Sequence, residues 1–214
     1  MELQPGKSIT FPRWLEWARE IQALAQTGDH YAANDFQRER YHRLAEIAAE
    51  IVSEHTALDS TGIMEIYLSQ AGYATPKVDV RAAAFRGDKL LLVRERSDGG
   101  WTMPGGWADV GDAPSESAER EAWEEAGFLV KARKLVGVYD ANRISPMELM
   151  HAYKVVFLCE VISGEATPSA ETSEVAFFTL NEIPLPLSEK RTPLRIIQDA
   201  FNAINNPGWA AVFD

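Results

Sequence analysis

Residues 106–128 read GWADVGDAPSESAEREAWEEAGF. This segment carries seven acidic residues and one base, Arg120, and its charge of −6 is more than half of the net −11 of the 214-residue chain. Carboxylates at this density repel one another unless cations offset their charge. The segment therefore predicts a cation-binding region.

The order of residues in and before this segment predicts a turn followed by a helix. Met103-Pro104-Gly105-Gly106 is typical of a turn that leaves a strand. Pro114 and Ser115 favour a helix start, with Ser115 as a cap, and Gly127 favours a helix end. We therefore expect a helix over residues 115–126.

Such a helix places three carboxylates together, because Glu121, Glu124 and Glu125 are spaced by three and four residues. A second face carries small side chains that a sheet can approach closely, namely Ala118, Ala122 and Ala126. Converging carboxylates suit hard divalent ions, Mg²⁺ above all. Such an ion bridges phosphate oxygens and activates water, so the implied chemistry is phosphoanhydride hydrolysis.

A Glu-rich helix is more often a solvated face than a metal site. The spacing here is more demanding, because it combines Gly106, Asp112, Arg120-Glu121, Glu124-Glu125 and Gly127-Phe128. This pattern resembles the Nudix box almost position for position. The resemblance implies an α/β fold, a Nudix α/β/α sandwich with a mixed sheet.

The same resemblance implies roles for individual residues. Glu121, Glu124 and Glu125, aided by the main-chain carbonyl of Gly105, would be ligands of Mg²⁺, with Mn²⁺ as an alternative. Arg120 would pair with Asp112, which stands where the family has glutamate and is one methylene shorter. We expect the remaining acids of the segment to be solvated charge, namely Asp109, Glu116 and Glu119.

The rest of the chain changes character at Ala74-Thr75-Pro76-Lys77. Apolar residues recur at helical spacing over residues 12–72, with breaks expected at 27–29 and 59–62. Beyond the hinge, β-branched and aromatic runs predict strands at 78–85, 90–93, 135–139, 153–161 and 175–178, and then a helix at 193–204. We expect a small all-helical N-terminal domain (1–73), a Nudix hydrolase domain (78–206) and a C-terminal tail (207–214).

The segment 12–28, PRWLEWAREIQALAQTG, resembles the N-terminal helical domain of some Nudix hydrolases of X-linked nucleoside diphosphates. Three short helices bury little apolar surface alone, so this domain either docks on its own catalytic domain or pairs with a second copy. We favour the homodimer. Trp14 and Trp17 could stack a nucleobase, but core or interface packing is the simpler interpretation.

Composition excludes several classes of partner. The pI near 4.9 argues against a nucleic-acid polymer, which requires clustered Lys and Arg. The sequence has no apolar run of membrane-spanning length and no leader pattern over residues 1–14, so we expect no membrane association and a cytoplasmic protein. Cys159, the single cysteine, lies in an apolar run and is expected to be buried.

Further site residues are expected outside the box. In many family members an acid from a loop before the last strand enters the site, which here means Glu171 or Glu174, with a slight preference for Glu174. Arg81, Arg94 and Arg96 lie where the family often supplies phosphate contacts, and guanidinium geometry suits that role. The four histidines show no ligand spacing and receive no catalytic role. Trp101 is expected to pack the strand before the turn.

The resemblance implies hydrolysis of a small nucleotide substrate, a nucleoside diphosphate linked to a moiety X, to a nucleoside monophosphate and phospho-X. ADP-ribose and CDP-choline are the leading substrates. One alternative is a sanitising pyrophosphohydrolase for oxidised or non-standard nucleoside triphosphates, which the extra helical domain disfavours. Another is a catalytically inactive ligand sensor, which the intact carboxylates disfavour.

Overall fold

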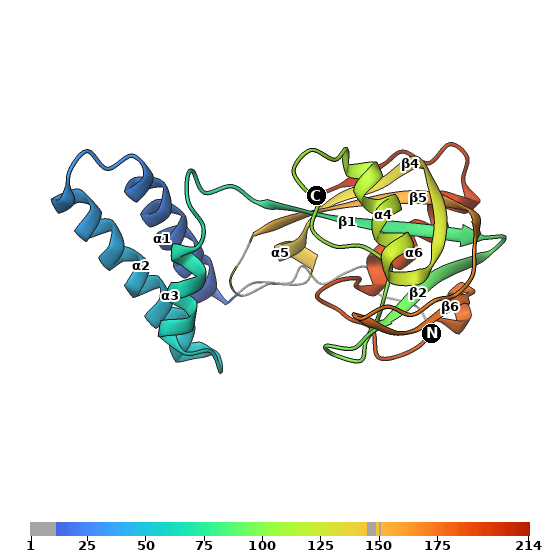
Figure 1. Cartoon of the computed structure of the whole chain (residues 1–214), viewed down its shortest axis with the longest axis horizontal. Coiled ribbons are helices and arrows are strands. Elements are labelled where there is room, and N and C mark those ends of the chain that lie inside the picture. The colour runs from blue at the N-terminus through green and yellow to red at the C-terminus, as the bar shows by residue number, and fades with distance from the viewer. Residues whose placement is uncertain (1–11, 145–148, 150) are drawn as a thin grey trace. The chain divides into compact units, whose positions relative to one another are not determined.

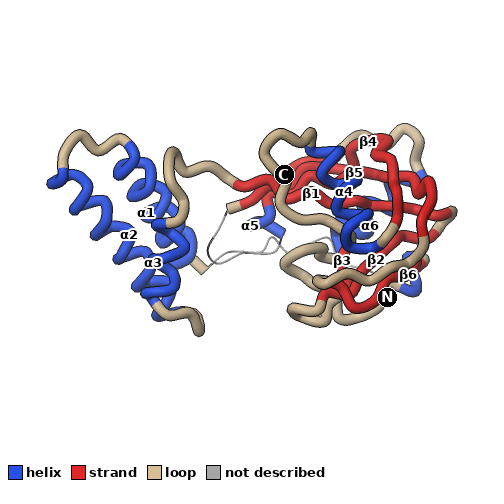
Figure 2. The backbone as a smooth tube through the Cα atoms, viewed as in Figure 1, coloured by secondary structure: helices blue, strands red, loops and turns tan. Residues whose placement is uncertain are grey.

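The computed structural model describes residues 12–144, 149 and 151–214. Contacts divide the described chain into two compact units (Figure 2). We call them the helical unit, which holds residues 12–76 with Leu149 and His151, and the sheet unit, which holds residues 77–144 and 152–214. The division after Pro76 falls inside the hinge that the sequence predicts.

The helical unit consists of α1 (Arg13–His30), α2 (Asp35–His55) and α3 (Ser60–Leu68). Small residues on α1 and α2 let the helices pack closely around Ile63 and Tyr67 of α3. Trp14 is half-buried and stacks on His55, whereas Trp17 is exposed. None of the described helices is long and apolar enough to cross a membrane.

The helix boundaries in this unit differ from the expected breaks. Gly28 lies inside α1, where its missing side chain leaves room for the ring of Tyr41. The first break comes later, and Asn34 starts α2 by accepting a hydrogen bond from the Gln37 N–H at 3.0 Å. Asp59 caps α3 in the same way through the Gly62 N–H at 2.8 Å. Side-chain caps, rather than the glycine, therefore set these boundaries.

The sheet unit contains a seven-stranded mixed sheet in the order β3-β2-β1-β5-β4-β7, with β6 paired to β2. Strands β1 and β5 are parallel, as are β4 and β7, and the other pairs are antiparallel. The strands are β1 (Lys77–Arg86), β2 (Lys89–Glu95), β3 (Trp101–Thr102), β4 (Phe128–Asp140), β5 (Ala152–Gly164), β6 (Thr172–Phe178) and β7 (Val212–Phe213).

Helices cover both faces of this sheet, as Figure 1 shows for α4 (Pro114–Ala126) and α6 (Leu194–Asn205). The three alanines of α4 pack against one face, as expected, together with Leu91 and Val93 of β2. The other face packs Leu90 and Leu92 against α6. The unit is completed by a short helix, α5 (Ala141–Ile144), and a 3₁₀ turn, η1 (Leu180–Glu182).

Trp101 and Cys159 are both buried in this core, as expected. Trp101 is buried and meets the ring of Phe178 edge to face. Cys159 is buried on the α4 side of the sheet, and burial raises the pKa of its thiol to about 12. Cys159 is therefore a packing residue rather than a nucleophile.

The acids that we expected to be solvated also have structural partners. Glu116 accepts a hydrogen bond from the N–H of Ala113, which is the residue before the helix, so Ser115 is not the cap. Glu119 accepts from the Ala132 N–H at 2.9 Å and ties α4 to an irregular part of β4. Asp109 pairs with Arg120 at 3.0 Å. Asp109 and Glu116 are nevertheless exposed, as expected, and only Glu119 is partly buried, because its partner lies on β4, which helix spacing does not reveal.

Residues 207–214, which the sequence set apart as a tail, extend the sheet. Strand β7 pairs with β4, and the Trp209 indole N–H donates to the Val136 carbonyl at 3.0 Å. The Asp214 carboxylate accepts from the Asp140 N–H at 2.9 Å. The segment is thus held along its length by the sheet unit.

The end of α4 yields a stability prediction. Gly127 has φ +75°, and a Cβ there would lie 2.6 Å from the Glu165 carbonyl, whereas at Gly87, with φ +64°, a Cβ would meet nothing within 4 Å. We expect Gly127→Ala to lower the free energy of unfolding by about 2 kcal/mol or more, and Gly87→Ala by only about 1 kcal/mol. Urea denaturation measures both. Equal losses would show that the contact with Glu165 adds no constraint.

Candidate active site

A glycine turn laid along β1 forms the floor of the candidate site. The β1 N–H groups of Val80 and Ala82 donate to the carbonyls of Gly106 and Pro104 at 2.8 and 2.9 Å. Gly105 between them has φ +148°, and a Cβ there would overlap the Val80 carbonyl. This position therefore requires glycine, because any side chain would push the turn away from β1.

Two carboxylates of α4 face this turn. Glu125 is 7% exposed and accepts a hydrogen bond from the Gly105 N–H at 3.0 Å. Burial raises its pKa to about 7. Glu121 lies beside the next residue, since a methyl group on Gly106 would come within 3.2 Å of its Oε2, and burial raises its pKa as well.

Arg120 gathers the remaining charge. Its guanidinium lies 3.0 Å from the Glu121 carboxylate and 3.1 Å from that of Glu124. The pair with Asp112 that the resemblance implies is present at 3.4 Å, the longest of the four ion pairs of Arg120. That length agrees with the lost methylene at Asp112. Glu124 itself is largely exposed.

The donor chemistry of this group fits a hard divalent cation. Within residues 12–144, 149 and 151–214, no three acidic, histidine or cysteine side chains are arranged to hold a metal ion, so the convergence of Glu121, Glu124 and Glu125 expected from helix spacing is not formed in this structure. Glu121 and Glu124 are bonded to Arg120, and Glu125 to the turn. The available ligands are oxygens from carboxylates and main chain, the set that Mg²⁺ and Mn²⁺ prefer.

Arg81 lies behind the turn, in a buried ion network. It binds both oxygens of Asp79, at 2.9 and 2.7 Å, and donates to the Met103 carbonyl at 3.2 Å. Lys154 of β5 reaches the same Asp79 at 3.2 Å. Burial alone would raise the pKa of Asp79, but the two cations outweigh it and hold that pKa below its usual value. Burial lowers the pKa of Lys154 to about 8.

A further buried acid, Glu95, is the last residue of β2. It follows an irregularity in the β2–β6 pairing and pairs with Arg191 at 3.3 Å. Burial raises the pKa of Glu95, and the nearby Glu171 carboxylate adds to the effect. Glu95 in turn acts on the pKa of Glu125. The loop acid Glu171 is therefore linked electrostatically to the Glu125 region.

Glu174, the other loop candidate, has a different environment. It stands opposite Arg94 in the β2–β6 pairing, and the two side chains form an ion pair at 2.7 Å. Arg94 continues the row of Leu90 and Leu92, which packs on the α6 side. Because β2 ends at Glu95, strand alternation does not extend to Arg96, which is exposed. Arg94 and Arg96 therefore do not lie two residues apart on the same face of one strand.

Sequence reasoning missed Glu95, Lys154 and Asp79. Asp79 and Arg81 alternate with apolar residues in one strand, and that two-residue spacing could have indicated a polar pair on one face. Lys154 and Glu95 gave no such signal. Lys154 is a single charge at the edge of an apolar run and Glu95 lies between two arginines, and the burial of each depends on partners far along the chain.

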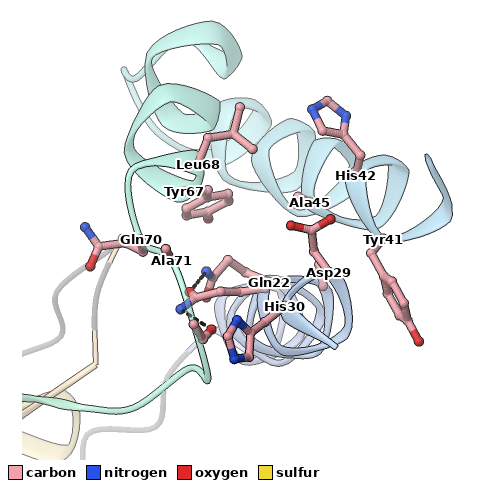
Figure 3. Close-up of a pocket in the computed structure, with 13 residues that line it drawn as sticks. Gln22, Asp29, His30, Tyr41, His42, Ala45, Tyr67, Leu68, Gln70 and Ala71 are labelled. Atoms are coloured by element: carbon pink, nitrogen blue, oxygen red, sulfur yellow. Dashed lines mark hydrogen bonds between the residues drawn. The ribbon is translucent and has the colours of Figure 1, made fainter. Parts of the chain in front are cut away.

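The helical unit has a separate cavity of about 180 Å³ between its three helices (Figure 3). Residues from each helix line it, including Gln22, Asp29, His42 and Tyr67. Its described lining holds no arginine or lysine, so a diphosphate would find no guanidinium or ammonium partner there. This composition makes the cavity a poorer site for phosphate chemistry than α4 and the glycine turn.

Two family models match the chain. The model described as "NUDIX domain" matches residues 75–199, and "UDP-X-like, N-terminal oligomerisation domain" matches residues 12–67. The chain belongs to the Nudix family, which confirms the expected Nudix hydrolase and its α/β/α fold with a helical N-terminal domain.

Relatives match along nearly the whole chain. It is 35% identical to "Putative ADP-ribose pyrophosphatase YjhB" of Bacillus subtilis, over 94% of this chain and 97% of that protein. A structure titled "Crystal structure of UDP-X diphosphatase" is 30% identical, with a TM-score of 0.61, covering 94% and 98%. An ADP-ribose pyrophosphatase from Streptococcus suis is 37% identical, with a TM-score of 0.60, covering 65% of this chain and 100% of that one.

The raised pKa of Glu125 predicts a pH dependence of stability. The folded state binds this proton more tightly than the unfolded state, with a pKa of about 7 against 4.5, so the stabilisation present below pH 4.5 is lost as the pH rises to about 7. The Glu125→Gln variant cannot lose a proton. In EDTA it should gain about 3 kcal/mol over wild type between pH 4.5 and pH 8.

Urea denaturation at several pH values measures this gap. A difference between the two proteins that does not change with pH would show that the Glu125 carboxyl is ionised normally in the fold.

Proposed function

We propose that this protein is a divalent-metal-dependent pyrophosphatase that cleaves a nucleoside diphosphate linked to X into a nucleoside monophosphate and phospho-X. The observation that carries the proposal is the pair of carboxylates, Glu121 and Glu125, that face the Gly105-Gly106 turn. Relatives named for ADP-ribose and UDP-X hydrolysis, matched over both units, support the substrate class.

Glu121, Glu124 and Glu125 would hold Mg²⁺, or Mn²⁺ in its place, together with the Gly105 carbonyl. When bound, the ion supplies charge neutralisation at phosphate oxygens and an activated water. Arg120 would give up its contacts with Glu121 and Glu124 and keep those with Asp109 and Asp112. Glu121 and Glu124 could therefore turn from Arg120 to the metal ion, because Asp109 and Asp112 would still pair with the Arg120 guanidinium.

We assign the loop acid that orients water to Glu171 rather than Glu174. Glu171 contributes to the raised pKa of Glu95, and Glu95 contributes to that of Glu125, whereas Glu174 is paired with Arg94 on the side of the sheet that carries α6. The ion pair of Glu174 and the electrostatic effect of Glu171 therefore favour the candidate that the sequence ranked second. The carboxylate that orients the attacking water must be able to reach it. A glutamate on the α6 side of the sheet, such as Glu174, is therefore a poorer candidate than its place in the sequence suggests.

The three arginines divide in the same way. Arg81 is saturated by Asp79 and the Met103 carbonyl, so its role is to brace the turn. Arg94 is held by Glu174 and the Gly99 carbonyl. Arg96 is exposed and, in the described part of the chain, pairs with no carboxylate. We assign Arg96 as the phosphate contact among the three.

ADP-ribose leads the candidate substrates, followed by CDP-choline and UDP-linked compounds. A panel with Mg²⁺ should include all three and an oxidised nucleoside triphosphate. We expect the highest turnover on a nucleoside diphosphate linked to X, with a nucleoside monophosphate as product. Glu125→Gln should lower that turnover at least about a hundredfold, as the loss of one strong electrostatic contributor does.

Glu119→Gln is the matched control, because it removes one charge from the same helix but keeps an oxygen to accept from Ala132. It should stay within about threefold of wild type. Turnover confined to oxidised triphosphates would replace the proposed substrate class, and no turnover on any compound would favour the ligand sensor. Near-normal activity of Glu125→Gln would refute the ligand assignment.

We further propose that the helical unit joins two copies of the chain into a homodimer. Trp17, Leu24 and Tyr31 are spaced by seven residues, lie on one side of α1 and its end, and are 51, 60 and 68% exposed. Exposed apolar side chains in such a row are typical of an interface. The match to an N-terminal oligomerisation domain supports this assignment.

Light scattering after gel filtration tests the dimer. Leu24→Arg places a charge in the middle of the row and should yield monomers, because burying an unpaired charge costs more than the interface gains. Ile162→Arg, an equally drastic change at an exposed apolar position of β5, should leave the dimer intact. A Leu24→Arg protein that stays dimeric would place the interface elsewhere.

A further inference from the structure

Thr172, at the start of β6, is joined to the end of α4. Its side chain is fully buried, and its hydroxyl donates to the main-chain carbonyl of Glu125 at 2.8 Å. The last carbonyls of a helix have no partner within the helix, so this hydroxyl supplies one. The contact links the residue after the loop acid Glu171 directly to a proposed metal ligand.

The same hydroxyl also closes the loop that carries Glu171. It accepts a hydrogen bond from the Ser169 N–H at 2.9 Å. The Ser169 hydroxyl in turn accepts from the N–H groups of Glu171 and Thr172, at 3.1 and 3.2 Å. Residues 169–172 therefore form a tight turn whose side chains satisfy its own main chain.

The turn is anchored on its other side by the residue that follows β2. The Arg96 N–H donates to the Glu171 carbonyl at 2.9 Å, directly after Glu95. The main chain of Glu171 is thus fixed by Ser169, Arg96 and, through Thr172, the end of α4. In this network one hydroxyl group both shapes the turn and attaches it to the helix.

We propose that Thr172 is a positioning residue for catalysis, whose hydroxyl holds the Glu171 carboxylate in register with Glu121 and Glu125. This inference rests on the proposed function. Thr172 does not touch substrate, and it acts through Glu171. A displacement of the turn by about 1 Å is enough to reduce turnover strongly, because the orientation of the attacking water depends on it.

Two substitutions separate the hydroxyl from the packing. Thr172→Val keeps the branched shape and removes the hydroxyl, whereas Thr172→Ser keeps the hydroxyl and removes a methyl group. On the substrate that wild type turns over best, we expect Thr172→Val to lower kcat about tenfold or more while KM stays within about twofold. Thr172→Ser should retain at least half of the wild-type kcat.

A double-mutant cycle tests whether Thr172 acts through Glu171. Glu171→Gln alone should lower kcat, and adding Thr172→Val to it should cost less than about twofold more, because the residue being positioned is already disabled. A merely structural role would instead produce losses that multiply.

Hydrogen exchange supplies a readout that does not depend on activity. In full-length protein, the amides of residues 166–174 should exchange faster in Thr172→Val than in wild type. Their exchange rates should be unchanged in Thr172→Ser. Thermal melting checks that each variant is folded at the assay temperature.

The outcomes are distinguishable. No turnover by wild type on any X-linked nucleoside diphosphate defeats the proposed function itself. If wild type is active, the positioning role is overturned by a Thr172→Val kcat near normal, by equal losses in Val and Ser variants, by multiplicative losses in the cycle, or by unchanged exchange at 166–174. Should Thr172→Val prove unfolded, Thr172→Ala in its place must show the same kcat and cycle pattern, and its failure to do so also overturns the role.

Discussion

The hydrogen bond from the Gly105 N–H to the Glu125 carboxylate is the contact on which the site depends. It exists because the turn lies flat against β1, which only a glycine at position 105 allows. The same turn leaves Gly106 without a side chain where Glu121 arrives. The two adjacent glycines thus let the carboxylate face of α4 approach β1 closely, because neither glycine has a side chain that would separate them.

The acids of residues 106–128 are stabilised in different ways. Arg120 gathers four carboxylates, Glu116 and Glu119 bond main-chain N–H groups, and Glu125 is buried with a raised pKa. The fold tolerates this arrangement because most acids have a partner that is independent of any ion. Glu125 accepts a hydrogen bond from the Gly105 N–H, but its pKa is still raised, so its burial is a cost that a bound cation would offset.

Local signals predicted much of this structure. The helix α4, its end at Gly127, the alanine face and parts of five strands followed from spacing and composition, since each depends on neighbours in sequence, whereas β3, β7 and the first half of β4 were not predicted. The start of α4, the break after α1 and the environment of Glu174 did not. They depend on Glu116, on the Tyr41 ring beside Gly28, and on the β2–β6 register, which are settled by tertiary contacts. Buried Lys154 shows the same limit, because its partner Asp79 is 75 residues away.

The location of a bound Mn²⁺ ion tests the central claim most directly, because its anomalous scattering marks the metal in a crystal of the full chain. The account predicts a peak about 2.0–2.3 Å from carboxylate oxygens of Glu121 and Glu125 and from the Gly105 carbonyl, with Arg120 turned toward Asp109 and Asp112. A peak at saturating Mn²⁺ that lies away from the glycine turn, or Arg120 still bonded to Glu121 and Glu124 with no ion between them, would contradict it.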